Sequence, residues 1–469
     1  MSARTKTIWT FVITSVALFM VTLDNLVVTT AIPVIRRDLN ASLEDLEWTV
    51  NAYTLTFAVL LLTGAALGDR FGRRRVFAIG VGVFTLGSVA AALAPSVEAL
   101  NLARALQGLG GAIVMPLTLT ILSAAVPKEK RGLALGAWGG ISGLAVAFGP
   151  VVGGAVVQGL SWQWIFWLNV PIGLVLIPLA LSRLQETHGP GGRLDLPGLG
   201  LASAGLFGIV WGLIQGNGQG WTSPEIVGSL AVGLALVAAF VAWELRTAAP
   251  MLPMRFFRKP AFALANVSSL FMFFGMFGSI FLLSQFFQTV QGYSPLGAGL
   301  RILPWTLAPM FISPIAGALS DRIPGKTLVG IGLSLQAGSL AWLGLVSTPT
   351  VAYSALIAPF VLAGIGMSLF FAPMANIVLS AVRPEEEGQA SGANNAIREL
   401  GGVFGVAVLA SVFATMGGYE SGQAFTDGMN PALIVGGIVV GLGALAAFAI
   451  PGRQPENDPV VGEQLVEAA

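Results

Sequence analysis

Three ionisable residues interrupt stretches of sequence that are otherwise apolar: Asp24, Arg104 and Glu399. A charged side chain inside a membrane costs several kcal/mol unless it is paired or lies in a wet cavity. Burial also favours the neutral, protonated form of a carboxyl group. A carboxyl that gains and loses a proton near neutral pH is what proton coupling requires, so Asp24 is the first candidate proton carrier. The alternative for Asp24 is a structural hydrogen bond to a neighbouring helix.

Arg104 shares one helical face with Gln107 and Gly108, which follow it three and four residues later. Its guanidinium does not lose its proton in proteins. A fixed positive charge that faces the same cavity as an acid ties the protonation of that acid to the conformation of the protein. The alternative is that Arg104 extends its side chain to one membrane surface.

Glu399 follows Arg398 directly, within a stretch that also reaches membrane-spanning length. Adjacent residues point about 100 degrees apart on a helix, so the two side chains are expected to have different partners. We consider Glu399 a second candidate for the proton or for a cationic substrate, and Arg398 a candidate cavity residue. The alternative is that both lie shallow, near one end of their span.

Two short charged segments lie between apolar stretches, and the second is a weaker copy of the first. The first copy provides Asp69, Arg70, Gly72, Arg73 and Arg74, and the second provides Asp321 and Arg322. Glycine allows a short connection between helices to take a positive φ, arginines favour the cytoplasmic side, and an aspartate can pair with an arginine. The repeat predicts two helical bundles, each with a conformational latch of charged residues.

Two further patterns lie within apolar stretches. Gly149, Pro150, Gly153 and Gly154 form a small-residue and proline motif, which predicts close helix packing and a possible kink. Phe273, Phe277 and Phe281 recur every four residues, with Gln285 after them. Such a surface suits varied hydrophobic cations, although aromatic side chains that simply pack against neighbouring helices or lipid are the more ordinary explanation.

The composition is that of a membrane protein. Of 469 residues, 55% are hydrophobic and only 10% are charged, too few charges to cover a water-soluble surface. A net charge of +1 without a basic stripe gives nucleic acid no binding surface. With no cysteine and one histidine, the chain lacks the residues for a nucleophile–base pair or a metal cluster. We therefore expect no enzyme, no metal and no cofactor.

Apolar segments of about 20 residues, long enough to cross a bilayer, predict an all-α membrane protein with fourteen spans. They begin near Ile8, Trp48, Val76, Leu100, Leu133, Trp164, Gly198, Ile226, Ala261, Leu296, Thr327, Val351, Gln389 and Pro431. Most of the 24 Lys and Arg residues fall on one side if both termini are cytoplasmic. The predicted division is a six-helix bundle in 1–184, a two-helix insertion in 185–258, a six-helix bundle in 259–452 and a disordered tail in 453–469.

These residues together resemble the major facilitator superfamily, and within it the fourteen-span drug:proton antiporters of bacteria. One group of residues is similar to the loop between the second and third helices of that family: Leu67, Asp69, Arg70, Gly72, Arg73 and Arg74. Others are similar to its first-, fourth- and fifth-helix motifs: Leu23, Asp24, Pro33, Leu100, Arg104, Gln107, Gly108, Gly110, Gly149, Pro150, Gly153 and Gly154. The segment entering helix 6 is matched by Trp162, Trp164, Phe166, Asn169, Pro171 and Gly173.

The resemblance implies alternating access, in which two bundles rock around a central cavity and inward proton flow drives outward drug movement. It implies that Asp24 and Arg104 line this cavity, that Glu399 lies on a helix where some relatives keep an acid, and that the Gly-Pro motif takes part in gating. The expected partners are hydrophobic or cationic drugs, protons and membrane lipids, for a monomer in the bacterial plasma membrane. The alternative is a dedicated exporter of one antibiotic or endogenous metabolite.

Overall fold

The structure is a computed structural model that describes residues 3–126, 131–188, 194–320, 322–383 and 386–451. In these residues thirteen helices are long and apolar enough to cross a membrane. A further helix, α5, spans 29 residues and contains the apolar stretch Phe148–Gly159. The helical architecture therefore agrees with the fourteen predicted spans. The expected disordered tail in 453–469 lies outside the described residues.

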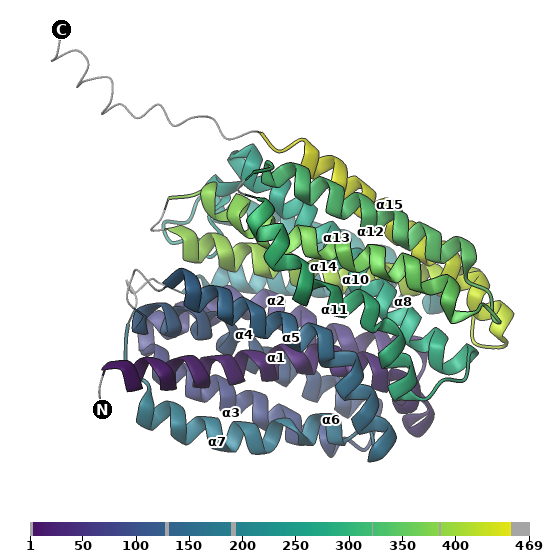
Figure 1. The fold of residues 1–469 in the computed structure, drawn as a ribbon, viewed down its shortest axis with the longest axis horizontal. Helices are drawn as coiled ribbons and strands as arrows, with labels where there is room; N and C mark the ends of the chain where they lie inside the picture. Colours follow the sequence, from purple (N-terminus) through teal and green to yellow (C-terminus); the bar gives the residue numbers. More distant parts are fainter. Residues whose placement is uncertain (1–2, 127–130, 189–193, 321, 384–385, 452–469) are drawn as a thin grey trace, which may run out of the picture.

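The first group of helices forms the lower part of the molecule in Figure 1. These helices are α1 (Ala3–Leu39), α2 (Leu43–Phe71), α3 (Arg73–Ala92), α4 (Val97–Ala125), α5 (Arg131–Gly159), α6 (Trp164–Trp167) and α7 (Asn169–Arg183). The short α6 and the longer α7 together make one candidate span, Trp164–Arg183. Helix α2 starts at Leu43, before the predicted start near Trp48, because Ser42 and Asp45 form a capping box with hydrogen bonds of 2.9 and 3.1 Å.

The last group of helices forms the upper part of the molecule in Figure 1. These helices are α10 (Pro260–Gln285), continued by a π-helical turn at Phe286–Val290, α11 (Pro295–Leu319), α12 (Gly325–Val346), α13 (Tyr353–Ser380), α14 (Glu387–Met416) and α15 (Gly422–Phe448). Helix α15 starts at Gly422 instead of near Pro431, because the Ser421 hydroxyl accepts a 3.0 Å hydrogen bond from the Ala424 amide and caps the helix. Pro431 lies inside this helix, as membrane helices permit.

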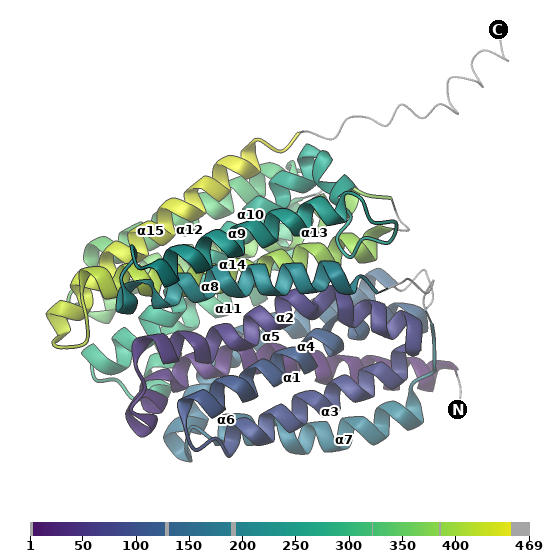
Figure 2. The same cartoon turned by 180° about the vertical axis from the view of Figure 1, so that it is seen from behind.

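Helices α8 (Leu196–Gln219) and α9 (Pro224–Glu244) form a hairpin that connects the two groups. Figure 2 shows this hairpin in front of the line where the two groups meet, with α8 between α2 and α14. An apolar cluster joins these three helices, with Val59 from α2, Ile214 from α8 and Val403 from α14 among its members. The hairpin therefore contacts both groups.

Helix α1 begins and α15 ends at the same end of the molecule (Figure 1). The connection between α2 and α3, with its arginines, lies at this end, which we call the basic end, and we call the opposite end the far end. The charged segment predicted to be a loop here is almost entirely helical, because α2 continues to Phe71 and α3 starts at Arg73. Only Gly72 separates the two helices, and its φ of 100° is readily accessible to glycine alone.

Candidate functional site

Asp24 and Arg104 form a fully buried ion pair between α1 and α4. Nη1 of Arg104 lies 2.5 Å from Oδ2 of Asp24, and the two residues are 0% and 3% exposed, respectively. The family resemblance implied that these two charges line one cavity, and the structure places them in direct contact with each other. Because the guanidinium is entirely buried, Arg104 does not extend to a membrane surface.

Further polar side chains from α3, α4 and α7 complete the surroundings of Asp24. Its Oδ1 atom accepts hydrogen bonds from Nε2 of Gln107 at 3.1 Å and from Nδ2 of Asn169 at 2.7 Å. Both donors also contact the Ser88 hydroxyl, at 2.8 and 3.3 Å. The site therefore gathers residues from α1, α3, α4 and α7. Ser88 and Asn169 were not predicted as site residues, although each is a polar residue in an apolar helix.

The guanidinium of Arg104 is held by α2 as well as by Asp24. Its Nε donates to the carbonyl of Thr49 at 3.2 Å, and its Nη1 donates to Oε1 of Gln107 at 3.0 Å. The ring of Tyr53 lies 4.3 Å from the guanidinium carbon, within the range of a cation–π contact. A buried charge needs several such partners to offset the loss of hydration. This arrangement provides them at Nε and Nη1, whereas Nη2 has no hydrogen-bond partner among the described residues.

Arg398 and Glu399 on α14 are not joined by a hydrogen bond or ion pair among the described residues, and the expectation that they have different partners stays a prediction. Nη1 of Arg398 donates to Oδ1 of Asn395 at 3.1 Å, and its guanidinium carbon lies 4.3 Å from the ring centre of Phe273. Oε2 of Glu399 is shielded from solvent and has no hydrogen-bond partner among the described residues. Among the residues that the structure describes, no hydrogen bond or ion pair joins Glu399 to the Asp24–Arg104 pair.

The predicted aromatic surface on α10 is buried, so its side chains do not face lipid. Phe273, Phe277, Phe281 and Gln285 are between 1% and 6% exposed. The rings of Phe273 and Phe277 stack with centres 6.0 Å apart. Oε1 of Gln285 accepts a 2.5 Å hydrogen bond from the hydroxyl of Tyr419. These contacts place the aromatic row among neighbouring helices, next to Arg398.

The charged segment at the basic end forms contacts inside the first group of helices. Asp69 pairs with Arg73 one turn later, at 2.8 Å. The backbone amide of Arg74 donates to Oε1 of Glu186 at 2.9 Å, and the side chain of Arg74 lies 3.5 Å from Oε2 of the same carboxylate. Glu186, which follows α7, was not predicted as a member of this latch. A Cβ on Gly72 would lie 2.8 Å from the Glu186 carboxyl carbon.

The remaining predicted latch residues have fewer described contacts. Arg70 lies with its guanidinium carbon 5.2 Å from the centre of the Phe71 ring. In the second copy Arg322 is exposed. Asp321 lies outside the described residues, so the two copies cannot be compared at their aspartates.

The Gly-Pro motif of α5 packs against helices of both groups. A Cβ on Gly149 would lie 2.6 Å from Cβ of Leu26 in α1, and one on Gly154 would lie 2.7 Å from Cα of Leu296 in α11. A Cβ on Gly153 would collide with the Thr30 hydroxyl. The glycines therefore allow α5 to approach α1 and α11 closely. On the α11 side Gly299 faces the backbone at Pro150 in the same way.

The two groups of helices are also joined by polar contacts at the far end. The Ser284 hydroxyl donates to the carbonyl of Thr29 at 2.9 Å, and Nε2 of Gln288 donates to the carbonyl of Thr30 at 3.0 Å. The guanidinium of Arg36 lies 3.4 Å from the centre of the Tyr419 ring. The seam between the groups is therefore closed here in this conformation.

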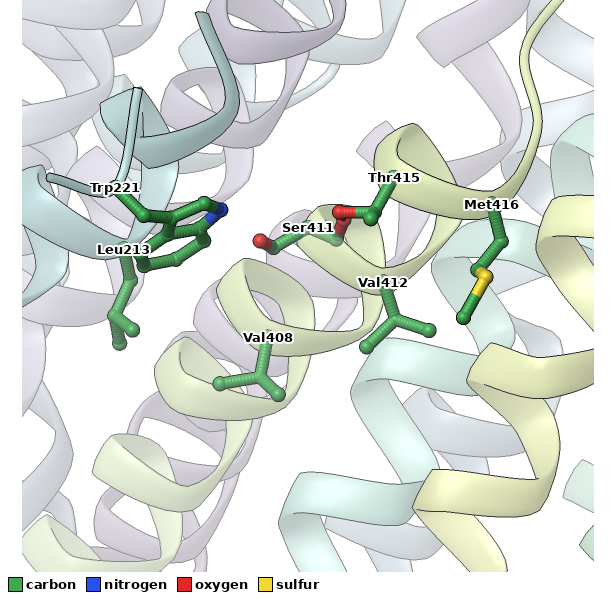
Figure 3. Close-up of a pocket in the computed structure, with 7 residues that line it drawn as sticks. All are labelled: Leu213, Trp221, Val408, Ser411, Val412, Thr415 and Met416. Atoms are coloured by element: carbon green, nitrogen blue, oxygen red, sulfur yellow. Dashed lines mark hydrogen bonds between the residues drawn. The ribbon is translucent and has the colours of Figure 1, made fainter. Parts of the chain in front are cut away.

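A cavity of about 300 Å³ lies outside this site, between the α8–α9 hairpin and α14 (Figure 3). Its walls are mainly apolar: Leu213, Trp221, Val408, Ser411, Val412, Thr415 and Met416. Asn217 beside it donates to the Ser411 carbonyl at 2.6 Å and accepts from Nε1 of Trp221 at 2.7 Å and from the Thr415 hydroxyl at 3.0 Å. These hydrogen bonds fasten the hairpin to α14.

Known relatives of the chain are resistance and export transporters. The multidrug resistance protein Stp of Mycobacterium tuberculosis is 36% identical over 86% of this chain and 75% of its own length. The tetracenomycin C resistance and export protein of Streptomyces glaucescens is 34% identical over 89% of this chain and 77% of its own length. The methylenomycin A resistance protein of Streptomyces coelicolor is 33% identical over 94% of this chain and 92% of its own length.

Among solved structures, an auto-inhibited peptide transporter of the POT family shares the fold, with a TM-score of 0.69 at 15% identity over 97% of this chain and 98% of that one. The family model for the Major Facilitator Superfamily matches residues 14–406 and 265–465. With its many spanning helices and transporter relatives, the protein is a multi-pass transporter of the bacterial cell membrane and not an enzyme. The chain belongs to the Major Facilitator Superfamily.

Proposed function

We propose that the protein is a proton-driven exporter of amphipathic drugs or antibiotics and belongs to the fourteen-span drug:proton antiporters. The observation that carries this proposal is the buried Asp24–Arg104 pair, in which one group can take up a proton and the other cannot. The names of the relatives support drug export. No cofactor is needed, because each charge that returns across 100 mV supplies about 2.3 kcal/mol.

In this proposal the chain forms six-helix bundles in 1–184 and 259–452, with the hairpin of 185–258 inserted between them, and it works as a monomer. The basic end is cytoplasmic, which places both termini inside. The arginines around Gly72 support this orientation, because Lys and Arg favour cytoplasmic loops. The common end of α1 and α15 is consistent with an even number of spans.

Protonation of Asp24 is the step that couples the proton to the conformation. A neutral Asp24 leaves Arg104 buried without its anionic partner, and breaking a buried pair in this way costs about 3–5 kcal/mol. That cost favours a different arrangement of α1, α3, α4 and α7. We assign the present conformation, paired at Asp24 and closed at the far end, to the state that follows proton release into the cytoplasm. Glu399 is the second candidate carrier.

The test measures proton release from acidified everted vesicles when hydrophobic cations and neutral antibiotics are added, with wild type compared with Asp24→Asn. Release that several compounds trigger in wild type, and that is lost in the variant, is the expected result. If efflux of every tested compound continued after the proton gradient was collapsed, the proposal would be overturned. Release unchanged in Asp24→Asn but lost in Glu399→Gln would move the carrier to α14.

A dedicated exporter of one antibiotic or metabolite is the second candidate function. The observation that favours it is that several relatives are named for single compounds, such as tetracenomycin C and methylenomycin A. The same panel separates the two candidates. A response to one compound supports the dedicated exporter, and responses to several unrelated compounds support the multidrug exporter.

A further inference from the structure

Two buried polar side chains on α2 carry atoms that have no hydrogen-bond partner among the described residues, and the proposed proton pathway does not use them. Glu47 is 2% exposed and Asn51 is 0% exposed. Oε2 of Glu47 and both polar side-chain atoms of Asn51 have no hydrogen-bond partner among the described residues. A buried polar atom without a partner costs about 1–3 kcal/mol, more if it is charged. Native structures contain few such groups, and each one requires an explanation.

Glu47 and Asn51 share one face of α2, since they are four residues apart. Helix α2 starts at Leu43, so Glu47 lies only about 6 Å along the axis from its start at the far end. Tyr53, whose ring contacts Arg104, points about 120 degrees away from Glu47 around the helix, and Thr49 contacts Arg104 through its backbone carbonyl. The unpartnered face is therefore distinct from the face that supports the Asp24–Arg104 pair.

The groups that surround this face at the far end come from both halves of the molecule. Burial raises the pKa of the Tyr419 hydroxyl, the charge of Arg36 lowers it, and the carboxylates of Glu47 and Glu44 raise it further. Tyr419, which precedes α15, packs against the apolar cluster that contains Leu46 and Val50 of α2, which come one residue before and three residues after Glu47. The Tyr419 hydroxyl also donates to the buried Gln285 of α10. Glu47 thus lies close to the seam where α1, α2, α10 and the segment before α15 meet.

Charge decides which ligand this face suits. Arg36 is the nearby cation, and its guanidinium is stacked on the Tyr419 ring at 3.4 Å, so it forms no ion pair with Glu47 among the described residues. Glu47 is left as a carboxyl without a cation, with an amide beside it that can accept or donate. A carboxylate binds an ammonium group through charge-assisted hydrogen bonds, and an aromatic ring nearby adds a cation–π contact.

We propose that Glu47 and Asn51 form a subsite for the protonated amine of an otherwise apolar exported molecule. The subsite lies at the far end, close to the seam between the two groups of helices, and it becomes accessible when the contacts of Ser284 and Gln288 with α1 separate. Glu47 accepts from the ammonium group and Asn51 provides its amide oxygen. This inference rests on the proposed function, because it assigns a substrate class to the same transporter.

The test measures binding of puromycin, which carries a primary amine, and of N-acetylpuromycin, its neutral counterpart, to the purified full-length protein in nanodiscs. Wild type is expected to bind the amine more tightly. In Glu47→Gln, affinity for the amine is expected to fall at least about tenfold, since a hydrogen bond to a charged group is lost, while affinity for the acetylated compound stays the same. Glu44→Gln, the same change one turn nearer the helix start, is the matched control and is expected to bind both as wild type does.

A second variant keeps the result independent of folding. Asn51→Asp adds a carboxylate to the same face and is expected to strengthen binding of the amine selectively, which a misfolded protein does not do. Equal effects on both compounds, or no preference for the amine in wild type, would overturn the proposal. A preference lost in Glu399→Gln and kept in Glu47→Gln would also overturn it. The proposed function fails separately, on the proton-release experiment with Asp24→Asn.

Discussion

Asn169 donates a 2.7 Å hydrogen bond to Oδ1 of Asp24, while Arg104 contacts the other carboxylate oxygen. Helix α7 is thereby fastened to α1 at the same carboxyl group that α4 holds through its arginine. A change in the protonation of this carboxyl group therefore affects its contacts with two neighbouring helices, α4 and α7. The arrangement makes Asp24 a structural centre of the first half as well as the candidate proton carrier.

Replacement of Asn169 by alanine is expected to destabilise the first half by about 1–3 kcal/mol, because Oδ1 of Asp24 loses one of its two donors in a buried site. Thermal unfolding in detergent measures this loss as a lower Tm. Ser88→Ala removes an acceptor that Gln107 and Asn169 share, and it is expected to cost less because both donors also contact Asp24. An Asn169→Ala variant as stable as wild type would show that this hydrogen bond does not hold α7 in place.

A double-mutant cycle on Asp24 and Arg104 is expected to show strong coupling. Asp24→Asn and Arg104→Met each leave a buried charge without its partner, at a cost of about 3–5 kcal/mol. The double variant removes both charges, so its stability loss is expected to be well below the sum of the two. The measurement is chemical or thermal unfolding of all four proteins. Additive losses would show that the two groups act independently.

Gly72→Ala is expected to slow export and lower stability. The φ of 100° at Gly72 is unfavourable for alanine by about 1–2 kcal/mol, and the added methyl group would lie 2.8 Å from the Glu186 carboxyl carbon. Gly82→Ala in α3 is the matched control, because its new methyl group would meet only Ile177, at 3.9 Å. Efflux rate and Tm are measured for both. Equal behaviour of the two variants would remove Gly72 and Glu186 from the latch.

Crosslinking tests which group of helices the α8–α9 hairpin moves with during export. The chain has no cysteine, so introduced pairs are the sole thiols. Asn217→Cys with Ser411→Cys, joined by a short bifunctional reagent, is expected to leave export at wild-type level, because α8 and α14 are already fastened there. Trp48→Cys with Phe207→Cys, whose rings are 5.6 Å apart in wild type, is expected to stop export when crosslinked. The reverse outcome would assign the hairpin to the first half.

Features that depend on composition and local spacing were predictable from the sequence. The length of apolar runs set the number of spans, and the type of residue singled out Asp24 and Arg104 as charges that need partners. Glycine at position 72 was expected to allow a positive φ between two helices, and its φ is 100°. The predicted length of the loop was wrong. The charged residues on either side of Gly72 belong to the ends of α2 and α3, so only Gly72 lies between the helices.

Features that depend on how helices are rotated against one another were not predictable. Asn169 and Glu186 contact residues distant in sequence, and only the packing of α7 brings them to Asp24 and Arg74. Glu47 stands near the start of a span, where an acid looks like an ordinary helix-end residue. The four-residue spacing between Glu47 and Asn51 indicated that both polar side chains share one face of a helix. The sequence could not show which neighbouring helices that face meets.

The two sides of α8 differ in the kind of contact they form. Toward α14 it is fixed by directional hydrogen bonds at Asn217, whereas toward α2 it meets apolar groups such as Leu55 and the ring of Trp48. Apolar contacts have no preferred register, so they can be exchanged one for another at little cost as the surfaces slide. If the two groups of helices rock against each other, we expect α8 to move with the last group and to slide along α2. The helix would then keep lipid out of the seam beside α2 as the seam widens.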